Sequence, residues 1–335
     1  MKQKEQISGG ATSLLIPTDR LDATVIEQAA DALSSYLDPT PLQPSVAFTS
    51  QTGANVWFKF EGIQPTRCFK VRGALNKLLS LTPEERAAGV ITASAGNHGQ
   101  GVAYAARIFG VTATVYVPEN ANRLKVEVIR RIGSEVIHHG TNYQEAYLEA
   151  MRVQSQRGAT FVHAFDDPQV IAGQGTVATE LLSQLPNFDT VLVPVGGGGL
   201  IAGISTYLKE RRAQTRVIGV EPRGAAGLAQ SLQAGRILSL ERVQTIADGL
   251  AASAPGVLPF ELAGRYVDEV IQVEEEELLQ TIRALFEWEH LLTEPAGAAA
   301  ATALLHHYHP FADERVVVIL SGSNVTNEVL IKALG

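Results

Sequence analysis

The chain has 335 residues and a formal net charge of −8 at pH 7. Apolar residues make up 45% and charged residues 19%, which is typical of a globular protein with a large core and room for two lobes. The acidic total and the lack of a basic run argue against a nucleic-acid partner, and the single cysteine, Cys68, excludes an intrachain disulfide. No apolar run has the form of a signal peptide or the length to cross a bilayer, so we expect a cytoplasmic protein without a membrane partner.

Residues 1–20 are predicted to form a loose arm, because chain ends are the least constrained parts of a domain. Beyond the arm, short β-rich runs alternate with amphipathic stretches of helical length. Several runs are almost wholly apolar, as expected of parallel strands covered on both faces. This alternation predicts an α/β protein with mainly parallel sheets flanked by helices. We predict nine strands, at 56–60, 90–93, 112–117, 135–138, 160–163, 190–195, 216–220, 270–273 and 316–320.

A lysine stands at the predicted start of the helix that follows the first of these strands. Lys70 comes after the proline-containing turn 64–67, and it lies between Phe69 and Val71. An ammonium at the positive end of a helix and between apolar neighbours is destabilised, so its pKa falls and the amine becomes a better nucleophile. Taken alone, Lys70 also fits an ordinary surface lysine, because most lysines are exposed.

Two further segments join a strand to a helix and are rich in small residues. In the segment 92–100, small residues let backbone amides approach an anion at a helix N-terminus, and Ser94 and Asn97 add polar side chains. A plain loop with an asparagine cap is the alternative there. The second segment has four consecutive glycines, which favours a nest of amides around a phosphate. These glycines are Gly196, Gly197, Gly198 and Gly199.

The segment 321–324 (Ser-Gly-Ser-Asn) follows the last predicted strand. A hydroxyl at the carboxyl end of a strand can meet the ring nitrogen of a ligand, although an ordinary turn has the same composition. Ligands of open α/β sheets bind at such strand ends. A reactive lysine, a phosphate loop, a carboxylate-binding loop and a hydroxyl together suit pyridoxal phosphate with a small amino-acid substrate.

Six motifs occur along the chain in one order, at 69–74, 94–100, 196–200, 247–250, 294–298 and 321–324. On these motifs the chain resembles, from about residue 21 to 334, the threonine/serine dehydratases (threonine ammonia-lyases) of the fold-type II pyridoxal-phosphate enzymes, which are related to serine racemase. The resemblance implies a two-lobed, tryptophan synthase β-like fold. A small substrate-closing domain, 83–157, would be inserted in a large cofactor-binding domain, 21–82 and 158–335. A homodimer or homotetramer is also implied.

The resemblance assigns roles to the residues of these motifs. Lys70 is expected to hold pyridoxal phosphate as a Schiff base and to act as the general base at the substrate α-carbon. The expected cofactor contacts are Phe69 at the ring face, Asn97 at the 3′ oxygen, Gly196, Gly197, Gly198 and Gly199 at the phosphate, Ser321 at the ring nitrogen, and Gly249 and Glu294 along the other edge. The substrate carboxylate is expected to meet Ser94, Ala95, Asn97 and His98.

The implied reaction is a β-elimination from a β-hydroxy-L-amino acid, which gives a 2-keto acid and ammonia. Ser321 favours elimination, because a neutral hydroxyl does not keep the ring nitrogen protonated and the ring is then a weaker electron sink. Threonine and serine are the leading substrates, and 3-hydroxyaspartate and phenylserine come next. The same set of motifs also leaves open a β-replacement synthase, a racemase and a catalytically silent cofactor-binding protein.

Several positions depart from the family pattern. Arg67 and Cys68 stand where glycine and serine are frequent. Arg67 would either bind a second substrate carboxylate or face solvent, and Cys68 would fill the volume of the serine. Ala95 lacks the hydroxyl that racemases use as a second acid/base. Glu221 is a weak metal-ligand candidate, because Gly227 stands where an aspartate is expected, so no metal is predicted.

Overall fold

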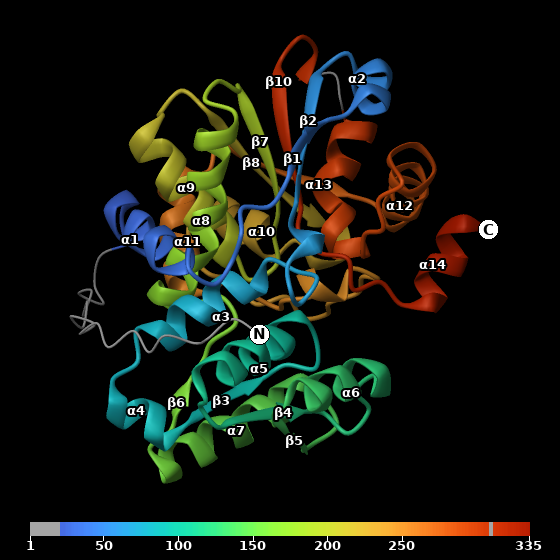
Figure 1. The fold of residues 1–335 in the computed structure, drawn as a ribbon. Helices are drawn as coiled ribbons and strands as arrows, with labels where there is room; N and C mark the ends of the chain where they lie inside the picture. Colours follow the sequence, from blue (N-terminus) through green and yellow to red (C-terminus); the bar gives the residue numbers. More distant parts are fainter. Residues whose placement is uncertain (1–20, 308–310) are drawn as a thin grey trace, which may run out of the picture.

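The computed structural model describes residues 21–307 and 311–335, so the predicted arm, 1–20, lies outside the described residues. In the described part of the chain, ten strands form two separate sheets (Figure 1). The strands are β1 (Leu42–Pro44), β2 (Asn55–Phe60), β3 (Val90–Ala93), β4 (Ala113–Val117), β5 (Glu135–His138), β6 (Thr160–Phe161), β7 (Thr190–Pro194), β8 (Arg216–Pro222), β9 (Glu269–Val273) and β10 (Arg315–Leu320).

The larger sheet has the order β1-β2-β10-β7-β8-β9 and is parallel except for β1, which pairs antiparallel with β2. All nine predicted strands are present, within a few residues at each end. β1 is the strand that the sequence does not reveal. It has three residues, ends in Pro44 and lies at the sheet edge, so it carries no alternation that would mark a strand.

Helices cover both faces of the larger sheet (Figure 1). Alternate residues of one strand point to opposite faces, so Val191 packs with the helices 168–184 and 199–211 while Leu192 packs with the helices 275–289 and 295–306. The helices are α1 (Ala23–Leu33), α2 (Val46–Thr52), α3 (Lys70–Leu79), α4 (Pro83–Ala88), α5 (Asn97–Phe109), α6 (Arg123–Ile132), α7 (Tyr143–Arg157), α8 (Pro168–Gln184), α9 (Gly199–Arg211), α10 (Gly227–Ala234), α11 (Val257–Tyr266), α12 (Glu275–Glu289), α13 (Pro295–His306) and α14 (Asn327–Leu334), with 3-10 turns η1 (Glu61–Ile63), η2 (Arg223–Ala225) and η3 (Asp248–Leu250).

The smaller sheet has the order β5-β4-β3-β6 and is wholly parallel. Helix α7 packs on one face, while α5 and α6 pack on the other. In Figure 1 this sheet and its helices form the lower lobe. The pairing of β6 with β3 carries the sheet to Phe161, past residue 157. Strand pairing alone does not set a domain boundary, so the division at 83–157 stays a prediction.

Local capping explains where the helices around the site begin and end. The Asn122 side chain accepts hydrogen bonds from the first turn of α6, and the helix stops at Gly133. Thr82 and Glu85 form a reciprocal capping box at the start of α4, where Pro83 occupies the first turn. The Asn122 cap starts α6 after β4, at the carboxyl end of that strand, whereas α5 and α9, which follow β3 and β7, begin after Gly96 and Gly198 without a side-chain cap.

Candidate active site

A cavity of about 750 Å³ lies where the carboxyl ends of strands from both sheets meet. Its lining comes from segments far apart in the chain, including those after β3, β6, β7 and β10. All four segments singled out in the sequence reach this cavity. The predicted site residues that line it are Phe69, Lys70, Ser94, Ala95, Asn97, His98, Gly197, Gly249, Glu294 and Ser321.

Lys70 is the first residue of α3, and it lines the cavity. The Nζ atom donates a hydrogen bond to the Ala164 carbonyl oxygen at 2.8 Å and lies 5.1 Å from the centroid of the Phe69 ring. Within the residues that the structure describes, this ammonium forms no ion pair with a carboxylate. Burial lowers the pKa of Lys70 to about 8, as the sequence predicts for a lysine among apolar neighbours.

The tetraglycine loop lies between β7 and the N-terminus of α9. The amide nitrogens of residues 196–199 donate no hydrogen bond to another described residue, so they are available to an anion. Packing adds a second reason for glycine, because a Cβ on Gly197 would lie 2.3 Å from the Phe165 ring. Gly198 has a φ of 91°, in the left-handed region that favours glycine.

The segment from Ser94 to His98 leads from β3 into α5. The Gly96 amide donates to Ser94 Oγ at 3.2 Å, which shapes the turn. The His98 ring is buried, with Nε2 2.9 Å from the Val162 carbonyl oxygen, and burial lowers the pKa of His98 to about 3. The ring is therefore neutral, and its Nε2 is engaged with Val162. An anion at this loop would meet the amides at the α5 N-terminus.

Asn97, Glu294 and Asn324 form a polar chain along one wall of the cavity. Asn97 Nδ2 donates to Glu294 Oε1 at 2.7 Å, and Asn324 Nδ2 donates to Asn97 Oδ1 at 2.7 Å. Burial, reinforced by the charge of Asp248, raises the pKa of Glu294 to about 7. Gly249 lies beside this chain, and a Cβ there would be 3.9 Å from Asn97 Nδ2.

The segment after β10 is held against the segment before α3. The Phe69 amide donates to the Ser321 carbonyl oxygen at 3.1 Å, and Cys68 forms an isolated bridge with Gly322. Ser321 is buried, and its hydroxyl lies 3.4 Å from the Ala296 carbonyl oxygen. Cys68 is buried, and burial raises the pKa of its thiol well above the ordinary value. The thiol is therefore neutral and fills space.

The side chain of Arg67 is exposed and does not line the cavity. Its φ of 59° lies in the left-handed region, where glycine is favoured, which accounts for the frequent glycine at this position in the family. Of the two roles considered for Arg67, exposure to solvent fits the structure.

Comparisons with known proteins agree with this geometry. Residues 33–322 match the family model described as pyridoxal-phosphate dependent enzyme. The chain belongs to this family. An L-threonine ammonia-lyase from Geobacter sulfurreducens is 46% identical over 305 residues, which cover 91% of this chain and 76% of that relative.

Two solved structures have the same fold. Threonine deaminase isoform 2 from Solanum lycopersicum has a TM-score of 0.89 and 32% identity, and the match covers 95% of this chain and 97% of that chain. Maize serine racemase has a TM-score of 0.89 and 34% identity, with 94% and 97% covered. The two-lobed fold-type II architecture and the resemblance to threonine/serine dehydratases are therefore confirmed.

The cavity of this pyridoxal-phosphate enzyme fits its cofactor. Free amides at 196–199 suit a phosphate, the Lys70 amine suits an aldehyde carbon, and the buried Ser321 hydroxyl offers a neutral partner to a ring nitrogen. The roles of the individual residues remain predictions. Glu221, the weak metal candidate, accepts hydrogen bonds from the Leu228 and Ala229 amides at 2.8 and 2.9 Å. In the described part of the chain no group of three His, Cys, Asp or Glu residues could hold a metal ion.

Two parts of the site are not predicted from the sequence: the residues after β6, and the pairing of Lys125 with Asp248 of the motif 247–250. Ala164 and Phe165 follow β6, and they contact Lys70 and the glycine loop respectively. Their position after a predicted strand end, 160–163, was the available signal. Lys125 and Asp248 form an ion pair at the cavity wall between α6 and η3. No local pattern identifies that pair, because the two residues are far apart in the chain.

Proposed function

We propose that the chain is a pyridoxal-phosphate-dependent ammonia-lyase that removes the β-hydroxyl and the amino group from a threonine- or serine-type L-amino acid. The observation that carries the proposal is the Lys70 amine, which is half-buried at the wall of the cavity, hydrogen-bonded to a carbonyl and, among the described residues, not paired with an acid. Such an amine is neutral at mildly alkaline pH and is available as a nucleophile and as a base. The products are a 2-keto acid and ammonia.

The residues of the chain supply binding and proton transfer. When bound, pyridoxal phosphate stabilises the negative charge that develops at the substrate α-carbon. Lys70 Nζ takes the proton from that carbon, while amides of the Ser94–His98 segment hold the substrate carboxylate at the N-terminus of α5. The Asn97 side chain of this segment donates to Glu294, and both side chains line the cavity, where they would orient the bound groups. Closure of the small lobe over the cavity would exclude water.

The charges at the cavity support an uncharged substrate side chain. Arg67 is exposed outside the cavity lining, and Lys125 at the wall is paired with Asp248. A second substrate carboxylate would thus meet no free cation from Arg67 or Lys125 and would lose its hydration without compensation. We therefore place L-threonine and L-serine before 3-hydroxyaspartate. Phenylserine stays open as an aromatic substrate.

Two further reactions have less support. A racemase needs a second acid/base on the far face of the substrate, and Ala95 has none to offer. The β-replacement synthases carry an acid soon after the cofactor lysine, whereas here Arg72 follows Lys70 and points into a buried charge cluster. A silent cofactor-binding protein would not need to retain the unpaired Lys70 amine.

The test is 2-keto-acid release from L-threonine, L-serine, threo- and erythro-3-hydroxyaspartate and phenylserine, with the Lys70→Ala variant as the control. We expect release from L-threonine and L-serine that vanishes in the variant. Release from 3-hydroxyaspartate alone would overturn the charge argument. A holoenzyme with its cofactor band that releases no keto acid from any member would overturn the ammonia-lyase proposal.

The assembly and the location of the protein are also proposals. Phe286, Trp288 and Leu292 expose large apolar side chains in and just beyond α12, which is typical of subunit interfaces and supports a homodimer or homotetramer. Sedimentation equilibrium tests this state. None of the helices in the described residues combines the length and the apolar character of a membrane span. The predicted cytoplasmic location is tested by cell fractionation.

A further inference from the structure

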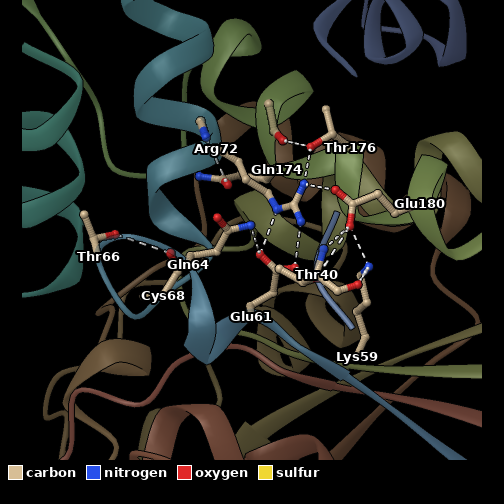
Figure 2. Close-up of polar contacts among 12 residues, drawn as sticks. Thr40, Lys59, Glu61, Gln64, Thr66, Cys68, Arg72, Gln174, Thr176 and Glu180 are labelled. Carbon is tan, nitrogen blue, oxygen red and sulfur yellow. Dashed lines mark hydrogen bonds and ion pairs between the residues drawn. The ribbon is translucent and has the colours of Figure 1, made fainter. Parts of the chain in front are cut away.

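Behind the reactive lysine, α3 contributes one residue to a buried charge cluster that the proposed reaction does not use. The cluster consists of Lys59, Glu61, Arg72 and Glu180, with the polar groups Thr40 and Thr176 beside them (Figure 2). Gln184 also contacts Lys59. The side chains of Lys59, Glu61 and Arg72 are at most 2% exposed, and that of Glu180 is 15% exposed. Two cations face two anions, so the cluster is neutral as a whole.

The guanidinium of Arg72 is the centre of this cluster. Its Nε and Nη2 donate to the two carboxylate oxygens of Glu61 at 2.7 and 2.8 Å. Its Nη1 donates to Glu180 Oε1 at 2.6 Å and to Thr176 Oγ1 at 3.1 Å. The planar fork thereby ties α3 to η1 on one side and to α8 on the other, in a single geometry (Figure 2).

The remaining members fix the partners of Arg72. Lys59 Nζ donates to Glu180 Oε2 at 2.5 Å, to the Thr40 carbonyl oxygen at 2.8 Å and to Gln184 Oε1 at 2.8 Å. Thr40 Oγ1 donates to Glu61 Oε1 at 2.6 Å. Each carboxylate that accepts hydrogen bonds from Arg72 therefore also accepts one from a second group. Neither is free to follow Arg72 if α3 moves.

Backbone packing removes the remaining freedom of α3. A Cβ on Gly101 of α5 would lie 3.2 Å from the Lys70 carbonyl carbon and oxygen. A Cβ on Gly173 of α8 would lie 2.7 Å from the Arg72 carbonyl oxygen and from the Gly73 Cα. Helix α3 thus lies directly against the backbones of α5 and α8. Sliding or rotation along these contacts is opposed by Arg72 at the first turn of α3. Farther along the helix it is opposed by Asn76, which donates to the Gln169 carbonyl oxygen, and by the Lys77–Asp167 ion pair.

Stability alone is a poor reason for such a cluster. Desolvating four charges is costly, and replacing a buried ion pair with well-packed apolar side chains of similar volume is often neutral or stabilising. Lys70 and Arg72 are two residues apart on one helix, so they project to nearly opposite sides of it. Any rotation of α3 that releases Arg72 therefore also turns Lys70 away from the cavity.

We propose that Arg72 is a positioning residue: it locks the first turn of α3 so that the Lys70 amine stays at the cavity wall. The inference rests on the proposed role of Lys70. A general base must lie within hydrogen-bond distance of the proton that it takes, and a displacement of about 1 Å can cost about 100-fold in rate. Arg72 touches neither substrate nor cofactor, and it acts through Lys70.

The structure offers a matched control on the same two helices. Lys77 Nζ lies 2.7 Å from Asp167 Oδ2, and this pair joins the other end of α3 to the start of α8. The Lys77→Met variant removes an ion pair between α3 and α8 two turns away from Lys70. It tests whether any loss of contact between these helices has the same effect.

The decisive variant is Arg72→Met combined with Glu61→Gln, which removes one charge of each sign and leaves Lys59 and Glu180 paired. Two readouts are made. In cofactor-free protein, the rate of Lys70 acylation by acetic anhydride is followed against pH by peptide mass spectrometry. In the holoenzyme, kcat and KM for L-threonine are measured.

For the double variant we expect the acylation midpoint to move from about 8 toward the ordinary lysine value of 10.5, because the amine leaves its buried position. We also expect kcat to fall by about 100-fold with KM little changed. Lys77→Met should keep the parent values of both. A folded double variant with the parent midpoint and kcat, or a Lys77→Met variant that matches the double variant, would overturn the proposal.

If the double variant does not fold, Arg72→Lys decides by the same two readouts, since it keeps the charge and loses the fork. A parent midpoint and a parent kcat in Arg72→Lys would also overturn the proposal. If the parent holoenzyme releases no keto acid, the proposed function fails by itself. The acylation midpoint still tests the position of the amine in that case, so the two failures are distinguishable.

Discussion

The two sides of helix α3 treat buried charge in opposite ways. On the cavity side, Lys70 has a carbonyl as its hydrogen-bond partner and its pKa falls to about 8. On the other side, Lys59 is fully buried but lies 2.5 Å from a carboxylate oxygen of Glu180. Burial lowers the pKa of Lys59 too, but Glu180 and Glu61 oppose the effect. A desolvated amine without an acid partner is available as a nucleophile or base, whereas a buried amine paired with a carboxylate holds parts of the fold together.

The first prediction concerns a variant without the Lys70 amine. Lys70→Ala should lower the rate of 2-keto-acid release by at least about 10⁴-fold, because the chain then has neither the cofactor-binding amine nor the base. The variant should also lack the absorbance of lysine-linked cofactor while its circular dichroism matches the parent. Keto-acid release near the parent rate would show that Lys70 has no catalytic role.

The second prediction concerns the ion pair between Arg72 and Glu61. Arg72→Met alone should lower the free energy of unfolding by about 3–5 kcal/mol, because Glu61 stays buried without its bidentate partner. Urea denaturation measures this loss. Adding Glu61→Gln should restore part of it, since the unpaired anion is gone. If adding Glu61→Gln to Arg72→Met lowers the free energy of unfolding further, Arg72 and Glu61 do not stabilise the fold as a pair.

The third prediction measures the cost of leaving Lys70 unpaired. Its folded-state pKa of about 8 lies below the ordinary 10.5, so below pH 8 folding must bury a charged amine. The penalty is fully present there and disappears as pH rises from 8 to 10.5. Cofactor-free Lys70→Met protein should therefore melt above the parent at pH 7, and the gap should close by pH 10.5. An equal gap at both pH values would contradict an unpaired Lys70.

The fourth and smallest prediction compares two buried carboxylates. Arg72 holds the pKa of Glu61 below its ordinary value. Within the described ranges, 21–307 and 311–335, the partners of Glu221 are two backbone amides, and burial raises its pKa to about 7. The stability linked to Glu221 is present below pH 4.5 and is lost as pH rises through 7. Glu221→Gln should flatten that part of the curve of melting temperature against pH. An unchanged slope would mean that Glu221 does not titrate there.

Much of the fold and part of the site follow from local sequence patterns. Apolar runs and alternation mark nine strands, because burial on one or both faces of a sheet imposes those patterns on the chain itself. Lys70, residues 196–199 and Ser321 are predicted from the sequence as site residues because functional groups of α/β proteins follow strand ends. β1 was missed, since a three-residue edge strand that ends in proline has no periodicity.

The sequence alone predicts the order of most elements, four of the segments that line the cavity and the presence of an arginine near the reactive lysine. Only the tertiary structure decided which acids pair with Arg72. Glu61 and Glu180 are 11 and 108 residues away along the chain, and nothing local distinguishes them from the remaining acids. It also decided that Arg67 is exposed and that Phe165 packs on Gly197. Pairing depends on which surfaces meet when the helices and sheets pack, and that is a property of the whole fold.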